Sequence, residues 1–161
     1  MKNIKYLYMV LIFFTIIVIK GMAAENNKEY KVLIGMTSNK AVNLKGIKTL
    51  VIDAEFFSKK DIEQLHKNGN VNIFSYLNIG SIETFRDDYE AFKDIALGDY
   101  ENWDEEKWIN VADKKWQKRI KDKARLLSQK GIDGFFLDNA DVYYHYQTPE
   151  IYRGLMTLLY E

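Results

Sequence analysis

The sequence contains no cysteine, a single proline and only two histidines among its 161 residues. The absence of cysteine excludes disulfide bonds, thiolate catalysis and zinc sites with cysteine ligands. His66 and His145 lie far apart and match no metal-binding spacing such as H-E-x-x-H, so we expect no metal ion. The glycine-rich loops that bind phosphate groups are also missing, so we expect no cofactor.

An excess of positive charge is absent as well, because 23 basic side chains balance 23 acidic ones. Lys2, Lys5 and Lys20 belong to a first segment of 23 residues without any acid, so the remaining 138 residues carry a net charge of −3. Proteins that capture DNA or RNA present clustered lysine and arginine to the phosphates. The mildly acidic body therefore predicts that nucleic acid is not a partner.

The first 23 residues have the pattern of a secretion signal. Lys2 and Lys5 form a positive amino-terminal region, residues 6–19 are mostly apolar, and residues 21–23 place small side chains around a signal-peptidase site. A membrane-spanning helix needs about 20 apolar residues, more than this run supplies. We predict a cleaved signal peptide over 1–23 and a secreted or extracytoplasmic domain over 24–161. An uncleaved membrane anchor is the alternative.

Strand-like and helix-like patterns alternate along the rest of the chain. The strand-like runs are residues 30–36, 49–54, 71–79 and 132–137. The helical patterns cover residues 58–69, 85–96 and 113–131 and a last segment that begins at Pro149. The second and fourth runs are typical of strands covered on both faces, and residues 98–110 look irregular. The order predicts an α/β fold with parallel strands, either an open doubly wound sheet or a (β/α)8 barrel.

Acidic side chains follow three of the four predicted strands. The residues concerned are Asp53 and Glu55, then Glu83, and then Asp138 and Asp141. Because the carboxyl ends of parallel strands line the ligand site, we expect these carboxylates to meet at one rim. A pair of carboxylates suits glycoside hydrolysis, in which one acts as acid and the other as nucleophile or base.

Aromatic residues near this rim would offer faces on which sugar rings stack, and the candidates are Tyr76, Trp108, Tyr143 and Tyr144. Packing is the alternative role for the tyrosines. Helix capping is the alternative for Glu55 and Asp141, and a place in the first turn of a helix is the alternative for Glu83. Asp138 follows an apolar strand and precedes another polar residue, which makes it the strongest candidate.

Two of these segments resemble glycoside hydrolase family 114, the relatives of endo-α-1,4-polygalactosaminidase. Residues 76–86 (YLNIGSIETFR) are similar to the family pattern Y-x-S-x-G-x-x-E-x-x-R. Residues 131–143 (GIDGFFLDNADVY) are similar to G-x-D-G-x-x-x-D-N-x-D-x-Y. Asp53 matches the aspartate that ends the second strand of the family, and Trp108 matches the tryptophan of its W-V-D-x-R stretch.

Three positions depart from the family pattern. Asn78 stands where serine is usual, Asn110 where aspartate is usual, and Ala112 where arginine is usual. We expect these changes to retune a sugar subsite or to weaken catalysis.

The resemblance implies a glycosidase that acts on an amino-sugar polymer, with Asp138 as acid/base and Glu83 as nucleophile. The substrate-binding residues that it implies are Asp53, Tyr76, Arg86, Trp108, Asn139, Asp141 and Tyr143. A non-catalytic or vestigial saccharide-binding protein is the second hypothesis, and an open α/β binding domain unrelated to sugars is the third.

The resemblance also implies a (β/α)8 barrel, which typically takes about 250 residues. We therefore expect the chain to hold about the first four βα units. Half a barrel leaves open sheet edges, which predicts a truncated or split gene product, self-association, or a complementing second half barrel.

Overall fold

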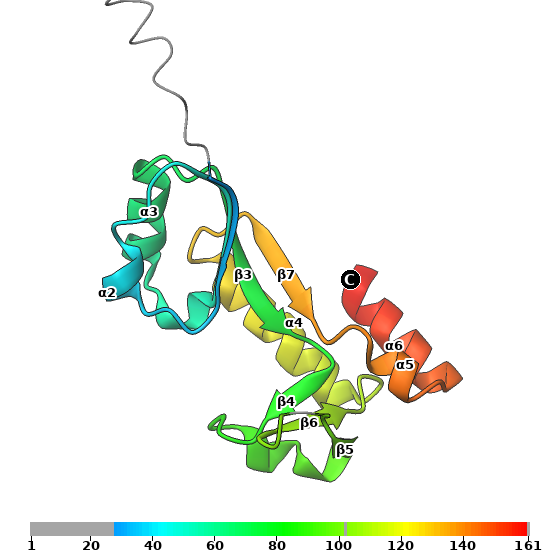
Figure 1. Ribbon diagram of the computed structural model, residues 1–161. Helices are drawn as coiled ribbons and strands as arrows, with labels where there is room; N and C mark the ends of the chain where they lie inside the picture. Colours follow the sequence, from blue (N-terminus) through cyan, green and yellow to red (C-terminus); the bar gives the residue numbers. More distant parts are fainter. Residues whose placement is uncertain (1–27, 102, 161) are drawn as a thin grey trace, which may run out of the picture.

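The structure is a computed structural model that describes residues 28–101 and 103–160. The signal peptide predicted for residues 1–23 lies outside the described residues. Figure 1 shows a parallel sheet, with helices packed along it, that continues into a small antiparallel sheet at one end. No helix in the two described ranges is long and apolar enough to cross a membrane.

The main sheet contains four parallel strands in the order β1-β2-β3-β7. Its strands are β1 (Lys28–Leu33), β2 (Ile47–Ile52), β3 (Asn72–Asn78) and β7 (Gly134–Asp138). Each of the four strand-like runs of the sequence contributes one strand. The predicted α/β class with parallel pairing is confirmed.

Three of the helices begin where the sequence signals predict them, and three short helical segments were not predicted. The helical segments are α2 (Ser38–Ala41), η1 (Ala54–Phe56), α3 (Lys59–Lys67), α4 (Lys114–Ser128), α5 (Val142–His145) and α6 (Pro149–Tyr160). Ser58 and Asp61 form a reciprocal capping box at the start of α3. At the start of α4, Asp113 accepts hydrogen bonds from the backbone N–H groups of Lys115 and Trp116.

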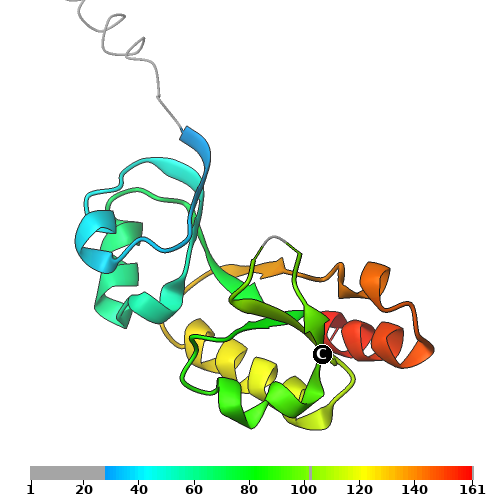
Figure 2. The ribbon, with the colours of Figure 1, turned by 60° about the horizontal axis from the view of Figure 1, so that its bottom comes forward.

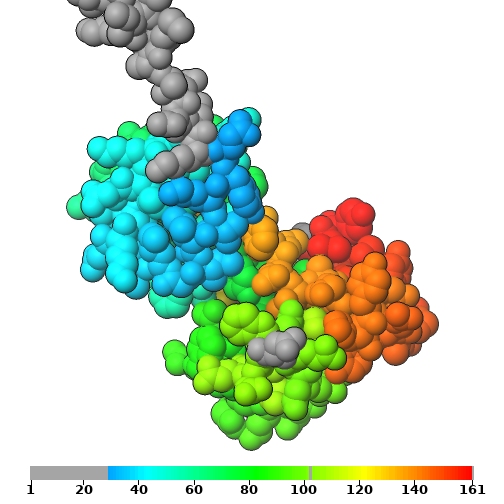
Figure 3. Space-filling model, viewed as in Figure 1, coloured from blue at the N-terminus to red at the C-terminus, as the bar shows by residue number. Residues whose placement is uncertain are grey.

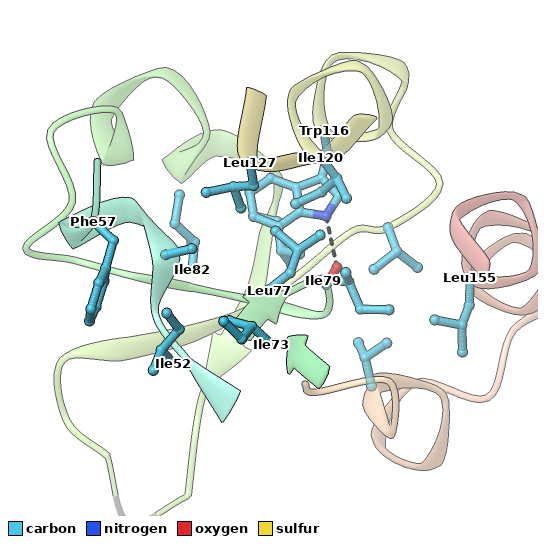
Figure 4. Packing of buried hydrophobic residues seen from close by; sticks show 14 of the residues in the cluster. Ile52, Phe57, Ile73, Leu77, Ile79, Ile82, Trp116, Ile120, Leu127 and Leu155 are labelled. Carbon is cyan, nitrogen blue, oxygen red and sulfur yellow. Dashed lines mark hydrogen bonds between the residues drawn. The ribbon is translucent and has the colours of Figure 1, made fainter. Parts of the chain in front are cut away.

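Helix α4 buries one stripe of apolar side chains against the sheet. Trp116 is fully buried, and its Nε1–H donates to the carbonyl of Ile79 over 2.9 Å (Figure 4). Ile120 and Leu127 continue the stripe at helical spacing. In Figure 2 the helix, drawn in yellow, runs along one face of β3 and β7. Side chains on the opposite face of the sheet contribute to the lining of the cavity described below.

The helix predicted for residues 85–96 is wrong, and residues 98–110 are not irregular. This region holds an antiparallel sheet in the order β4-β6-β5, together with two short 3-10 turns. Its elements are β4 (Ser81–Glu83), η2 (Tyr89–Ala91), η3 (Lys93–Ile95), β5 (Ala96–Asp99) and β6 (Glu106–Ile109). Tertiary contacts override the helical spacing, because Phe92 packs edge-on against Trp116 and Asp88 pairs with Arg119 of α4.

The second and fourth strand-like runs, now β2 and β7, were expected to be covered on both faces. This expectation holds in part for β2 and fails for β7. Leu50, Val51 and Ile52 of β2 are fully buried. Strand β7 lies at the edge of the sheet, and its Leu137 is 36% exposed. An edge strand keeps apolar side chains accessible unless further elements cover them.

Helix α6 approaches the loop before α4 closely, and Gly154 permits this approach. A Cβ atom built on Gly154 would lie 2.6 Å from the backbone N and Cα atoms of Ala112. We expect Gly154→Ala to lower the free energy of unfolding by about 1–3 kcal/mol, because the methyl group must displace the neighbouring backbone. Urea denaturation of both proteins measures the change.

The control is Thr157→Ala on the same helix. Within the described residues, the hydroxyl that it removes donates only to the carbonyl of Arg153. We expect it to change the free energy of unfolding by less than about 0.5 kcal/mol. An equally small effect of Gly154→Ala would show that α6 does not pack this closely in solution.

Candidate active site

A cavity of about 530 Å³ lies at the carboxyl ends of β3 and β7. Its carboxylates are Glu83, Glu105, Glu106 and Asp138, and its aromatic residues are Tyr76, Phe85, Tyr100 and Trp103; Ile34 and Asn139 complete the lining. Figure 3 shows the surface hollowed where the amino-terminal strands, the antiparallel sheet and the end of β7 meet. Four of the predicted site residues, Tyr76, Glu83, Asp138 and Asn139, thus line one cavity.

Strand register brings Asp138 and Tyr76 to the same face of the main sheet. Asn78 is paired with Asp138, and Tyr76 with Phe136, two residues earlier on β7. Because side chains two residues apart point the same way, Tyr76 and Asp138 both face the cavity. Burial, the charges of Asp138 and Glu83, and a hydrogen bond to Asp138 raise the pKa of Tyr76. The phenol therefore remains protonated beside Asp138.

Glu83 is held by the guanidinium of Arg86. The Nη2 and Nε atoms of Arg86 donate to the two carboxylate oxygens of Glu83 over 3.0 and 3.2 Å. Burial lowers the pKa of Arg86, but the hydrogen bonds and charge of Glu83, with the charges of Glu55 and Asp53, raise it more. Arg86 therefore stays cationic, and its two parallel bonds fix the orientation of Glu83.

Asp53 and Arg86, both predicted to bind substrate, do not line the cavity. Asp53 is 3% exposed, and its Oδ2 lies 3.7 Å from Nη2 of Arg86. Nη1 of Arg86 donates to Glu55 over 2.6 Å, and Lys123 also pairs with Glu55. Burial raises the pKa of Asp53. The donors of Arg86 therefore serve three carboxylates of the protein, and Asp53 supports the group that holds Glu83.

Three further predicted residues also lie outside the cavity lining. Trp108 is 3% exposed and is stacked between Tyr100 and His145, with ring centroids 4.3 and 4.4 Å away. Tyr143 contacts the ring of Tyr152, and Asp141 stands exposed before α5. The faces of Trp108 are already covered by protein, so its packing supports the wall of the cavity.

Glu106 and Tyr100 were not predicted as site residues, yet both line the cavity. Oε1 of Glu106 accepts hydrogen bonds from Asn78, Ser81 and Asn139, and the Tyr100 hydroxyl donates to Asn139. No local signal in the sequence separates Glu106 from its neighbour Glu105. Only the pairing of β6 with β4 brings Glu106 to the end of β3.

The positions that depart from the family pattern have distinct surroundings. Asn78 takes part in the hydrogen bonds around Glu106. Oδ1 of Asn110 accepts from the N–H of Ala112 over 3.0 Å, which closes the turn before α4. Ala112 lies against Gly154 of α6. Only Asn78 is therefore bonded to a residue of the cavity lining.

The arrangement offers carboxylates for proton transfer and for attack, and aromatic side chains for sugar rings. Among the residues that the structure describes, no lysine, arginine or histidine lines the cavity. In the part of the chain that the structure describes, no group of three His, Asp or Glu side chains is placed to hold a metal ion.

The sequence matches the family model of Glycoside-hydrolase family GH114 over residues 20–156. No curated protein sequence matches the chain. The structure is similar to the glycoside hydrolase domain of PelA from Pseudomonas aeruginosa, with a TM-score of 0.63 and 17% identity, over 84% of this chain and 54% of that one. It is similar to Ega3 of Aspergillus fumigatus, in a complex with galactosamine, with a TM-score of 0.63 and 23% identity, over 85% of this chain and 55% of that one.

The structure is also similar to TtGalA, an α-galactosidase from Thermus thermophilus, with a TM-score of 0.58 and 10% identity. That match covers 84% of this chain and 36% of the other. The likeness confirms the predicted fold, which is that of TIM-barrel glycoside hydrolase domains. The chain spans about half the length of the PelA and Ega3 structures, so it covers only part of the barrel.

Proposed function

The chain belongs to glycoside-hydrolase family GH114, and on that premise we propose that it hydrolyses glycosidic bonds in an amino-sugar polysaccharide. The observation that carries the proposal is the meeting of Glu83 and Asp138 at one cavity, each with a different partner. Arg86 supplies a permanent cation to Glu83, whereas Asp138 lies beside the neutral phenol of Tyr76.

In the proposed reaction these partners set the two roles. Asp138, in its protonated form, donates its proton to the oxygen of the leaving sugar. The Glu83 carboxylate, oriented by Arg86, attacks the anomeric carbon. Asp138 then takes a proton from the water that releases the sugar from Glu83. Both carboxylates return to their starting states, and one glycosidic bond has been hydrolysed.

The charge of the cavity supports a cationic sugar as the substrate. Over residues 28–101 and 103–160, four carboxylates and no basic residue line the cavity, and Glu83 is the one of the four that forms an ion pair, with Arg86. A protonated amino sugar brings the opposite charge to such a site, whereas its N-acetylated form is neutral. Tyr76, Phe85 and Trp103 supply aromatic surface for the rings. The similar Ega3 structure contains galactosamine.

Two further parts of the proposal concern location and completeness. Export follows from the signal-like pattern of residues 1–23. A complementing set of βα units would cover the open face of the main sheet. In support, Tyr30, Val32 and Ile34 are 54%, 41% and 46% exposed on or next to the edge strand β1. Contiguous apolar surface of this kind marks an interaction site.

The test is hydrolysis of α-1,4-linked polygalactosamine by the purified protein, with release of reducing ends as the measurement. The matched substrate is the same polymer after full N-acetylation. We expect turnover at least about tenfold faster on the amine form, since one lost charge contact is worth about 1.4 kcal/mol or more. Binding of the amine polymer without turnover would favour the saccharide-binding alternative. If the protein neither binds nor hydrolyses the polymer, both the hydrolase and the saccharide-binding functions are contradicted.

A further inference from the structure

Asn139, directly after Asp138, has an unusual backbone conformation with φ of 59°. Asparagine tolerates this left-handed region better than most residues, but it needs surroundings that hold it there. The side chain is 7% exposed and fully engaged. Its Nδ2 donates to Oε1 of Glu106 over 2.8 Å and to Ser81, and its Oδ1 accepts from the Tyr100 hydroxyl over 3.2 Å.

The backbone around Asp138 is also held by the two residues that follow β3. The carbonyl of Asp138 accepts from the N–H of Ile79 over 3.1 Å. The carbonyl of Asn139 lies so close to Gly80 that a Cβ atom there would be 1.7 Å from its oxygen. Asp138 is the last residue of β7, and the side-chain and backbone contacts around it restrict the conformation of the backbone at this point.

Glu106 is the residue on which these side-chain contacts converge. Its Oε1 accepts from Asn139, from Asn78 over 2.9 Å and from the Ser81 hydroxyl. These donors come from the ends of β7 and β3 and from the start of β4. Within the described ranges, no hydrogen bond or ion pair involves Oε2 of Glu106. One oxygen atom on β6 thus connects three strand ends.

We propose that Glu106 is a positioning residue for Asp138, acting through Asn139, in the reaction proposed above, on which this inference rests. Glu106 holds the Asn139 side chain and with it the left-handed turn. That turn sets the direction in which the Asp138 carboxylate enters the cavity. The contribution of Glu106 depends on an acceptor at Oε1 and does not depend on its charge.

This distinction gives a sharp comparison between two substitutions. Glu106→Gln keeps an acceptor oxygen at Oε1 and changes only Oε2, so we expect kcat within about threefold of wild type, roughly 0.7 kcal/mol or less. Glu106→Ala removes the acceptor, and we expect kcat to fall by about 10²-fold, as a misplacement of about 1 Å produces. Both substitutions remove one carboxylate of the cavity, so any rise in KM for the amine polymer should be similar in the two variants. If Glu106 acted by its charge, Gln and Ala would be equally harmful.

A double-mutant cycle with Asn139→Gly tests the path through Asn139. Glycine accepts the left-handed backbone but lacks the side chain, so Asn139→Gly should lower kcat about as much as Glu106→Ala. We expect the double variant to be within about threefold of the worse single variant, because both remove one interaction. Effects that multiply would overturn the proposal.

The control is Glu101→Ala, which changes an exposed glutamate that lies before β6 and does not line the cavity, and it should leave kcat unchanged. The backbone amide signals of residues 138–140 provide a readout independent of turnover. They should move in Glu106→Ala and remain in place in Glu106→Gln. Amide signals of residues 138–140 that do not shift in Glu106→Ala would overturn the proposal. If the wild-type protein hydrolyses no polymer, the proposed function fails, and these signals alone decide whether Glu106 positions Asp138.

Discussion

Asp138→Asn is expected to lower kcat on an amino-sugar polymer by about 10²–10⁴-fold, the usual contribution of a general acid. Asparagine keeps the shape of the side chain but has no proton to give to the leaving oxygen. The strand that carries Asp138 keeps its pairing with β3, so the fold should be unchanged. The measurements are release of reducing ends and the circular dichroism spectrum of each protein.

Asp99→Asn is the matched control, because Asp99 also ends a strand, β5, but is exposed and lies outside the cavity lining. It should retain wild-type turnover. A well-folded Asp138→Asn protein with kcat within a few-fold of wild type would restrict Asp138 to a structural role. The acid would then have to be sought elsewhere.

Arg86→Met is expected to lower the free energy of unfolding at neutral pH by about 3 kcal/mol or more, as loss of one partner from a buried ion pair does. The substitution preserves much of the apolar stem but leaves three carboxylates without their shared cation, those of Asp53, Glu55 and Glu83. The side chains of Arg86 and Glu83 are only 17% and 15% exposed, so water replaces little of the lost interaction. Urea denaturation across a pH series measures the effect.

The pH dependence has a definite sign. Burial already raises the pKa of Asp53, so folding favours its neutral form. The stability associated with that form is present below the ordinary pKa of 3.8 and is lost as pH rises through the raised value. In Arg86→Met the guanidinium no longer offsets the charge of ionised Asp53, so the loss of stability with rising pH becomes larger. The cost of Arg86→Met should therefore be smallest at acid pH and grow as pH rises.

Two variants serve as controls for this cluster. Arg125→Met removes an exposed ion pair with Asp122 and should cost less than about 1 kcal/mol at any pH. Arg86→Lys keeps the charge but not the two parallel bonds to Glu83. Its loss of unfolding free energy should therefore lie between those of Arg125→Met and Arg86→Met. A pH-independent cost of Arg86→Met would show that packing, and not charge, accounts for the loss.

The sequence by itself determined the class of fold and the rim on which the acids lie. Parallel strand order follows from alternating periods, and Ser58, Asp113 and Pro149 mark helix starts through contacts with near neighbours. Asp138 and Tyr76 reach one cavity because their strands are adjacent and parallel. Such features depend on residues a few positions apart or on a regular strand period, which a sequence displays directly.

Tertiary structure alone decided what each side chain does at that rim. Arg86 has the residue type of a substrate ligand, but its donors are taken by carboxylates from two segments more than 25 positions apart. Trp108 has the residue type of a sugar platform, but Tyr100 and His145 cover its faces. Glu106 joins the site only because β6 pairs antiparallel with β4. Helical spacing in residues 85–96 is overridden there, since local propensity amounts to tenths of a kcal/mol per residue and burial of one large side chain to about 1.5–3 kcal/mol.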